Sequence, residues 1–225
     1  MITNKFPYTE IKRTRVEGKR LYDTETGFLP SVTTILSKTE PYEKRKSLQA
    51  WRDRVGHEEA QKITTEAANV GTLMHQYLED WAIHDKYERA DNIIHRTAGR
   101  MADTVIKNIS PHLDEVWGTE VNLYYPGLYA GTIDLPGVWK GQEAIMDFKQ
   151  TNKPKKREWI EDYFMQGCAY GNAHNELFGT NIKTVAIFMC SRDSEFQLFE
   201  ITGDEFDEYS SKWAHRVGEF YNLDK

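Results

Sequence analysis

Alternating apolar and polar residues in the middle of the chain predict the two strands around which the rest is arranged. The first covers residues 130–135 and the second residues 143–149. Alternation over this length is typical of strands in a sheet. Residues 136–141, between them, contain a proline and two glycines, so we expect a hairpin or a short meander there.

Helical periodicity elsewhere predicts that helices flank these strands. In residues 64–85, for example, Val70, Met74 and Leu78 lie on one helical face. We expect other elements in this order: a hairpin at 8–23 turning at Glu17-Gly18, a short helix from Ser31 or Thr33 to Leu36, helices at 41–55 and 89–109, a strand at 115–124, a helix at 156–178, strands at 183–190 and 196–201, and a helix at 204–221. This order indicates one α/β domain over residues 1–225, with an N-terminal hairpin and helical elaboration in 1–110 and the core in 111–225.

The composition is that of an ordinary globular protein, because 39% of the 225 residues are hydrophobic and 12% are aromatic. No apolar run is long enough to span a membrane, and the N-terminus lacks the features of a secretory signal or a mitochondrial transit peptide. We therefore expect a cytoplasmic protein with no membrane partner. Cys168 and Cys190 are the only cysteines, and both lie in apolar segments, so we expect two reduced, buried thiols.

The net charge of −6 argues mildly against nucleic acid as a partner, but local charge matters more than the total. Positive residues cluster in two places. One cluster directly follows the second predicted strand, and the other lies on the predicted helix at 41–55; their members are Lys153, Lys155, Lys156 and Arg157, and Lys44, Arg45, Lys46, Arg52 and Arg54. Each cluster is either a solvated charged surface or a surface for phosphates.

The two central strands also carry the candidate chemistry. Side chains alternate along a strand, so Asp147 and Lys149 share one face, and the hairpin can bring Asp134 beside them. Two carboxylates this close repel each other unless a cation lies between them, and their hard oxygen atoms suit Mg²⁺ or Mn²⁺. A neighbouring lysine can position a water or neutralise a phosphate. Taken alone, the same residues fit a hairpin that is merely salt-bridged.

Three motifs in this order resemble the PD-(D/E)XK nuclease superfamily, in its RecB-type exonuclease branch. Asp134 followed by Asp147-Phe148-Lys149 resembles the superfamily's core motif. Residues 71–75 (GTLMH) resemble the branch's G-x-x-x-H motif, and residues 166–170 (QGCAY) its Q-x-x-x-Y motif. Residues 29–36 (LPSVTTIL) look like the N-terminal part of the group that includes phage exonucleases and the mitochondrial genome maintenance exonuclease. The resemblance extends from about residue 21 to about residue 200.

The resemblance implies a restriction-endonuclease-like core, in which a central mixed sheet is flanked by helices. It also implies a metal-dependent DNA exonuclease that uses Mg²⁺ or Mn²⁺ and acts in DNA recombination, repair or degradation. The implied metal ligands are His75, Asp134, Asp147 and the Phe148 backbone carbonyl, with Lys149, Gln166 and Tyr170 as further catalytic residues and Glu120 as an accessory. Without the motif set, His75 would be a hydrogen-bonded residue at the edge of the core, Gln166 and Tyr170 would be helix-packing residues, and Glu120 would be a solvent-facing carboxylate.

In the resembling exonucleases, helices roof the active site so that a single strand with a free end threads through. Here the helices at 41–55 and 58–85 are the candidates for that roof. Lys44, Arg45 and Arg52 would follow the phosphates, and Trp51 would stack on bases. A separate helicase, recombinase or single-strand-binding protein is an expected partner. Two cysteines cannot supply the four ligands of an iron–sulfur cluster, so we expect none. The compact form suggests a phage or bacterial origin.

Two alternative functions remain open at this point. The first is a structure-specific endonuclease on the same core, against which the His75 and Gln166–Tyr170 motifs argue. The second is a non-catalytic DNA-binding recombination accessory protein, against which the complete set of Asp134, Asp147 and Lys149 argues. A helicase or other ATPase is disfavoured, because the chain has no G-x-x-x-x-G-K-[ST] loop.

Overall fold

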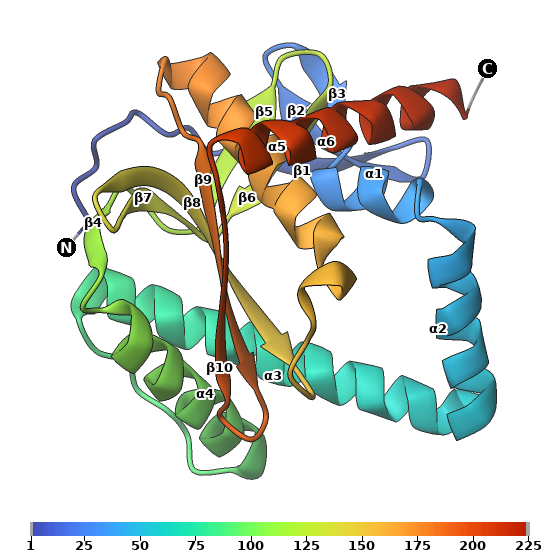
Figure 1. Cartoon of the computed structure of the whole chain (residues 1–225), viewed down its shortest axis with the longest axis vertical. Coiled ribbons are helices and arrows are strands. Elements are labelled where there is room, and N and C mark those ends of the chain that lie inside the picture. The colour runs from blue at the N-terminus through green and yellow to red at the C-terminus, as the bar shows by residue number, and fades with distance from the viewer. Residues whose placement is uncertain (1, 224–225) are drawn as a thin grey trace.

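The computed structural model describes residues 2–223, and a five-stranded mixed sheet lies at its centre (Figure 1). The strands are β4 (Leu113–Val116), β7 (Leu135–Trp139), β8 (Gln142–Thr151), β9 (Thr184–Ser191) and β10 (Phe196–Thr202), in the order β10-β9-β8-β7-β4. The pair β8 and β9 is parallel, and the other pairs are antiparallel. The parallel pair needs a crossover, which a helix supplies.

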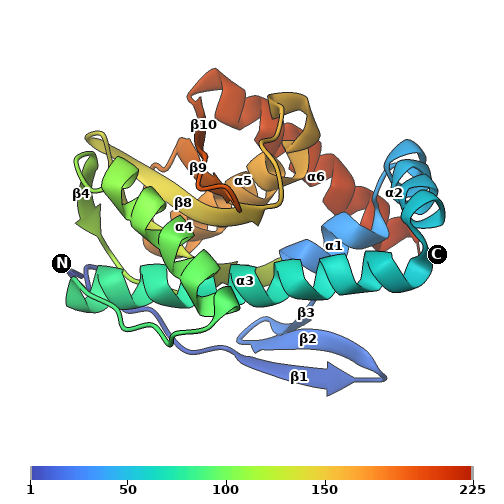
Figure 2. The ribbon, with the colours of Figure 1, turned by 90° about the horizontal axis from the view of Figure 1, so that it is seen from below.

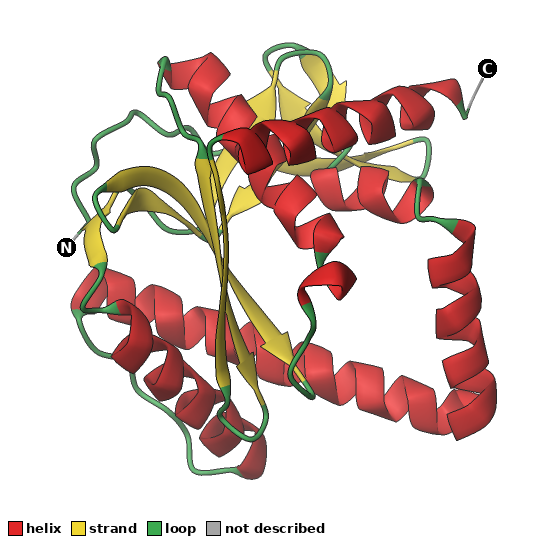
Figure 3. Cartoon of the chain, viewed as in Figure 1, coloured by secondary structure: helices red, strands yellow, loops and turns green. Residues whose placement is uncertain are grey.

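Helices cover both faces of this sheet (Figure 3). On one face α3 (His57–His84) and α4 (Ile93–Ile109) pack over Met146 and Phe148, and on the other α5 (Glu161–Phe178) and α6 (Asp204–Asn222) share a core with Ile145. Successive residues of β8 alternate between the two cores, as the pleat requires. The predicted fold class, a mixed α/β core with a central mixed sheet flanked by helices, is confirmed.

Two smaller sheets of the described chain are separate from the central sheet, and Figure 2 shows the one made of β1, β2 and β3. The predicted N-terminal hairpin is present as β1 (Lys12–Val16) and β2 (Lys19–Thr24), and β3 (Gly27–Leu29) adds to it. Its turn is at Glu17 and Gly18, as expected, and both have positive φ. The other pair is β5 (Val121–Tyr125) and β6 (Tyr129–Ile133), and a bridge between Ser31 and Ala130 connects it to the end of β3.

Two predicted N-terminal helices are also present. In α1 (Val32–Lys38) the Ser31 side chain accepts a hydrogen bond from the Thr34 backbone N–H, which is the expected cap. The helix α2 (Tyr42–Val55) follows Pro41 and ends at Gly56. It contains no buried residue, and Figure 1 shows it standing off from the sheet at the N-terminal end of α3.

Three predicted helix starts are wrong. The helix α3 begins at His57 rather than near residue 64, since its first turns are exposed and carry no apolar stripe. Asn92 accepts hydrogen bonds from the first N–H groups of α4, so that helix starts at residue 93 rather than 89. The expected helix at 156–178 is a short 3₁₀ turn, η1 (Arg157–Trp159), followed by α5.

Three strand predictions also need correction. Residues 115–124 contain the end of β4 and most of β5, which belong to different sheets, and Glu120 lies between these strands with φ of 48° instead of within a strand. Residues 136–139 belong to β7, and the turn is at Lys140 and Gly141, both with positive φ. The predicted strand at 130–135 is interrupted at Asp134, where the chain passes from the two-stranded sheet to the central one.

The helices at residues 57–109 form one layer over the central sheet, although they lie in the stretch that we expected to be an elaboration. The division of the domain near residue 110 stays a prediction. Cys168 and Cys190 are free and buried, as expected. Among residues 2–223, no helix is long and apolar enough to cross a membrane.

Candidate active site

The corner between β6 and β7 places Asp134 against the middle of β8. Its Oδ2 atom accepts a hydrogen bond from the Phe148 backbone N–H at 2.8 Å. This bond holds the carboxylate beside Asp147 and Lys149, the residues that flank Phe148. The structure therefore brings together the Asp134 and Asp147-Phe148-Lys149 segments, as the sequence predicted.

Asp147 and Lys149 lie on the face of β8 that α5 covers, and their side chains form an ion pair at 2.5 Å. Both are largely buried, with side-chain exposures of 8% and 17%. The Lys149 ammonium also lies 5.0 Å from the ring centre of Tyr163. The Lys149 ammonium is the partner of the buried Asp147 Oδ2 atom, and a carboxylate oxygen can accept from more than one donor.

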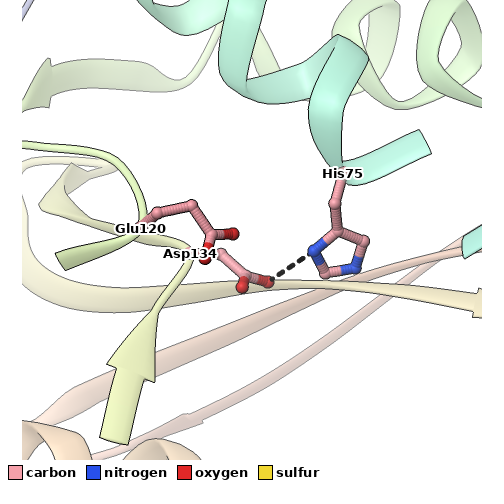
Figure 4. Close-up of side chains that lie close together, drawn as sticks. All are labelled: His75, Glu120 and Asp134. Carbon is pink, nitrogen blue, oxygen red and sulfur yellow. Dashed lines mark ion pairs between the residues drawn. The ribbon is translucent and has the colours of Figure 1, made fainter. Parts of the chain in front are cut away.

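His75 comes to the same place from the opposite helix layer. It projects from α3 toward β8, and its Nδ1 atom lies 3.5 Å from Asp134 Oδ2 (Figure 4). The Phe148 ring packs edge-on against its imidazole, with 6.0 Å between ring centres. Glu120 enters from the loop between β4 and β5. One ligand atom from each of His75, Glu120 and Asp134 lies within 4.8 Å of the others.

The two aspartates of the site differ in acidity. Burial raises the pKa of Asp147 to about 6, because the attraction of Lys149 offsets only part of the cost of burying a charge. Burial acts in the same direction on Asp134, but His75, Lys149 and the Phe148 N–H together outweigh it, so the pKa of Asp134 is lowered. The site therefore holds one firmly ionised carboxylate and one that is readily protonated.

The remaining ionisable groups respond to the same charges. Burial lowers the pKa of His75, but the Asp134 carboxylate outweighs it and the net shift is upward. For Lys149 the carboxylates likewise outweigh burial and raise the pKa, so it stays an ammonium. Burial, and then the charge of Asp134, raise the pKa of Glu120 to about 7. Carboxylates thus outnumber cations here, and an added positive charge would relieve the imbalance.

Gln166 and Tyr170 lie on the helix α5, above the same side of the sheet. The Gln166 amide donates to the Tyr170 hydroxyl at 3.3 Å. Tyr170 is 3% exposed, and its ring packs directly on Gly131 of β6, where an added Cβ would lie 2.5 Å from a ring carbon. Burial raises the pKa of its phenol, so it stays protonated and can donate a hydrogen bond.

The donor set suits a divalent cation. It combines carboxylate oxygens with an imidazole nitrogen, and within it His75 and Asp134 are partly buried while Glu120 is exposed. His75, Glu120 and Asp134 form the tightest group, while Asp147 is held by Lys149. The identity of the metal is not fixed by these residues, because Mg²⁺ and Mn²⁺ both accept oxygen ligands.

The basic residues expected to bind DNA differ in whether their charge is already paired with a carboxylate. Lys44 forms an ion pair with Asp162, and Arg157 forms one with Glu205 while donating to the Glu200 carbonyl at 3.1 Å. The others are exposed: Lys153, Lys155 and Lys156 in the loop after β8, and Arg45 and Arg52 on α2. Trp51, the expected stacking residue, is half-buried.

One arginine next to the site was missed at the sequence level. Arg13 of β1 donates to Thr132 Oγ1 at 2.7 Å, two residues before Asp134, and it lines cavities on both sides of this contact. We predicted residues 8–23 only as a hairpin, with the positive charges interrupted by Glu10 and Glu17, and gave those charges no binding role. The usable signal was the alternation along the hairpin, which places Arg13 and Tyr22 on one face.

Comparison with known proteins gives the following similarities. No family model matches the chain. It is 24% identical over 208 residues to "Mitochondrial genome maintenance exonuclease 1" of Xenopus tropicalis, covering 86% of this chain and 58% of that protein, and 24% identical over 206 residues to the Mus musculus protein of the same name, covering 88% and 60%. The chain thus spans about three fifths of these relatives' length. A crystal structure of a "Putative exonuclease" from Eubacterium rectale aligns with a TM-score of 0.47 and 12% identity, over 70% of this chain and 68% of that one. The predicted similarity to an exonuclease family is confirmed by the two relatives.

Proposed function

We propose that this protein is a metal-dependent nuclease of the PD-(D/E)XK type that removes nucleotides from free ends of DNA. The observation that carries the proposal is the convergence of Asp134, Asp147 and Lys149 at the middle of β8, with His75 on the opposite side. The relatives named as exonucleases support the substrate class and the attack at ends. The process would be recombination, repair or degradation of DNA.

In this proposal His75, Asp134, Asp147 and the Phe148 carbonyl hold a divalent cation, with Glu120 as an additional or alternating ligand. The cation, when bound, lowers the pKa of a coordinated water and stabilises charge on the phosphate. The Asp134–Phe148 hydrogen bond fixes the ligand geometry in advance, because it sets the carboxylate against the backbone of β8.

Lys149 positions the attacking water and stabilises the negative charge that develops on the phosphate oxygens. Its pKa is raised, so it acts as a cation and hydrogen-bond donor rather than as a base. Asp147 holds the ammonium in place through the 2.5 Å ion pair. Gln166 and Tyr170 donate hydrogen bonds to the DNA backbone beside the scissile phosphate, since both are held on one face of α5.

A nuclease that acts only at ends must exclude circular DNA, which has no free end, from its active site. The expected roof consists of α2 and the exposed first turns of α3, and the Lys44–Asp162 ion pair connects α2 to the start of α5. A strand that passes between these elements would have to enter by a free end. Arg45 and Arg52 would contact its phosphates on the exposed surface of α2.

The test uses end-labelled linear and closed circular single-stranded DNA, each with Mg²⁺, Mn²⁺ or EDTA. Wild-type protein should shorten the linear DNA only with metal and leave the circle intact, and Lys149→Ala should be inactive on both. Lys107→Ala, an exposed lysine of α4, is the matched control and should behave as wild type. If the wild-type protein cut the circular DNA, the proposed exonuclease activity would be wrong and the protein would be an endonuclease. If the wild-type protein bound DNA but cut neither substrate, the protein would be a non-catalytic DNA-binding protein.

A further inference from the structure

The N-terminal hairpin turns an arginine-rich face toward the candidate active site. We propose that Arg13 and Arg20, supported by Arg15, form a subsite that binds a phosphate of the DNA strand next to the scissile one. This inference rests on the proposed function, because it takes the ligand to be a nucleic-acid strand. It assigns a binding role to a three-stranded sheet that lies outside the motif-bearing elements.

The strand register puts these side chains on one face. Arg13 pairs with Tyr22 and Arg15 pairs with Arg20 across β1 and β2. Directly opposed residues of an antiparallel pair point to the same side, and so do residues two apart on one strand. Arg13, Arg15, Arg20 and Tyr22 therefore share a face. Tyr22, which is 4% exposed, turns its part of this face toward the body of the protein, while the three arginines are exposed.

Arg15 and Arg20 repel each other in this arrangement, because like charges directly opposite on a strand pair destabilise it. Within residues 2–223 no carboxylate forms an ion pair with Arg13, Arg15 or Arg20. The charge of Arg13 reaches Glu120, where it acts to lower the pKa against the larger effects of burial and Asp134. Three arginines that share a face and have no ion pair within the described residues favour the binding of an external anion.

A cavity of about 260 Å³ lies against this face. Besides the two arginines it is lined by hydroxyl and amide groups from three other elements, namely Ser31, Thr33, Thr34, Thr132, Gln166 and Tyr170. Guanidinium groups bind phosphate oxygens in a bidentate manner, and hydroxyl and amide groups are common additional donors. The cavity is smaller than those that hold drug-sized molecules and suits a single phosphate.

Arg13 connects this cavity to the metal-ligand cluster. It also lines a second cavity, of about 570 Å³, whose walls include His75 and Glu120. Its guanidinium is held by the 2.7 Å bond to Thr132, which also accepts from or donates to the Tyr22 hydroxyl at 3.3 Å. Thr132 lies two residues from Asp134 on the same chain segment. The phosphate subsite is therefore fixed relative to the candidate catalytic carboxylate, as consecutive phosphates of one strand require.

The test measures binding of a labelled linear single-stranded oligonucleotide in EDTA, by fluorescence anisotropy at several salt concentrations. The variants are Arg20→Gln and the double variant Arg15→Gln/Arg20→Gln, and the matched control is Lys12→Gln on the opposite face of β1. We expect the double variant to bind about tenfold more weakly than the wild type. The slope of the logarithm of the binding constant against the logarithm of the salt concentration should become shallower by about 0.7 for each phosphate contact that is lost. The control should change affinity by less than about twofold, since it removes charge but no defined contact.

Thermal unfolding separates binding from a structural role. The double variant removes a repulsive pair, so its melting temperature should equal or exceed that of the wild type. An oligonucleotide with a terminal phosphate, compared with one ending in hydroxyls, shows whether the bound phosphate is terminal or internal. Unchanged binding by the double variant, or a loss matched by Lys12→Gln, would overturn the subsite while leaving the nuclease proposal standing. A wild type that neither binds nor cleaves DNA would remove both.

Discussion

The Oδ2 atom of Asp134 accepts a hydrogen bond from the backbone N–H of Phe148 at 2.8 Å, although Asp134 lies between two strands, β6 and β7, and Phe148 lies within β8. The bond connects the corner between β6 and β7 to the middle of β8. It fixes Asp134 relative to Asp147 and Lys149. These two residues flank Phe148 on β8, and the alternation of the strand places both of their side chains on one face. A site assembled in this way is rigid because backbone, rather than flexible side chains, sets its spacing.

Asp134→Asn separates this structural role from the charge of the carboxylate. The amide oxygen can still accept from the Phe148 N–H, so the fold should be retained. The negative charge that attracts a cation is lost, and we expect Mn²⁺ affinity and DNA cleavage to fall by about a hundredfold or more. Titration calorimetry with Mn²⁺ and a cleavage assay check this. Full activity in Asp134→Asn would show that Asp134 only connects the strands.

His75→Ala should weaken metal binding by about tenfold to a hundredfold while leaving the fold intact. The imidazole lies at the edge of the core and contacts Asp134 at 3.5 Å, so its removal takes away one nitrogen ligand and little packing. His84→Ala, at the exposed end of the same helix, is the control. Equal Mn²⁺ affinities of the two variants would exclude His75 as a ligand.

Gly71→Ala tests the glycine of the G-x-x-x-H segment. A Cβ at Gly71 would have Gln150 Cβ as its nearest contact at 3.6 Å, which is an ordinary distance. Alanine is favoured over glycine within a helix by about 1 kcal/mol, so the variant should be slightly more stable. Gly71 lines the cavity that contains His75 and Glu120, and an added methyl group there should reduce cleavage.

The control for that variant is Gly218→Ala in α6, where a Cβ would meet nothing within 4 Å. It should gain a similar stability, measured by chemical denaturation, and keep wild-type cleavage. If Gly71→Ala also kept full activity, the glycine would be unnecessary for the approach of substrate. A loss of stability in Gly71→Ala would indicate instead that α3 packs more closely than the structure shows.

Gly131→Ala should have the opposite effect on stability. A Cβ at residue 131 would lie 2.5 Å from a ring carbon of Tyr170 and 2.7 Å from its hydroxyl oxygen. The ring is buried and cannot move freely, so overpacking should cost about 1–3 kcal/mol and displace the Tyr170 hydroxyl from Gln166. Chemical denaturation measures the stability. Cleavage of DNA should fall more than the unfolded fraction explains, if Tyr170 contacts the substrate.

Patterns within single elements predicted much of this fold. The alternation of β8 correctly placed Asp147 and Lys149 on one face, and the Ser31 cap and the turn at Gly18 were correct because each depends on local chemistry. The exposed first turns of α3 were missed, since no buried stripe marks them. Hydrophobic periodicity indicates which face of a helix is buried, so it gives no signal for a helical segment that extends beyond the core.

The site was harder to predict where it depends on breaks in the strands. Glu120 was expected on a regular strand, but it lies between two sheets with positive φ, and that break places it beside His75. Arg13 lies on β1, in a three-stranded sheet separate from the sheet that contains β7 and β8, and it contacts the site through Thr132. Such contacts between distant segments leave no short-range signal in one sequence, so only the three-dimensional arrangement reveals them.

The acidity of the site predicts how metal ions should affect stability at different pH. Because burial raises the pKa of Asp147 to about 6, the folded protein holds this proton more tightly than the unfolded chain does, for which the ordinary value is 3.8. The stability that this group contributes is complete below the ordinary value and is lost as the pH rises through about 6. Burial and the Asp134 charge raise the pKa of Glu120 to about 7, with the same sign.

A divalent cation competes with these protons, because it binds only the ionised carboxylates. Its stabilising effect should therefore be small near pH 5, where Asp147 and Glu120 are largely protonated, and should rise to a few degrees of melting temperature at about pH 7.5. Thermal unfolding with Mn²⁺ and with EDTA at both pH values measures this difference. Asp134→Asn should abolish it at about pH 7.5, whereas Asp114→Asn, on the edge strand β4, should preserve it. A metal-induced shift of equal size at both pH values would mean that the ion binds elsewhere on the protein, because a site built from Asp147 and Glu120 has to release protons as it fills.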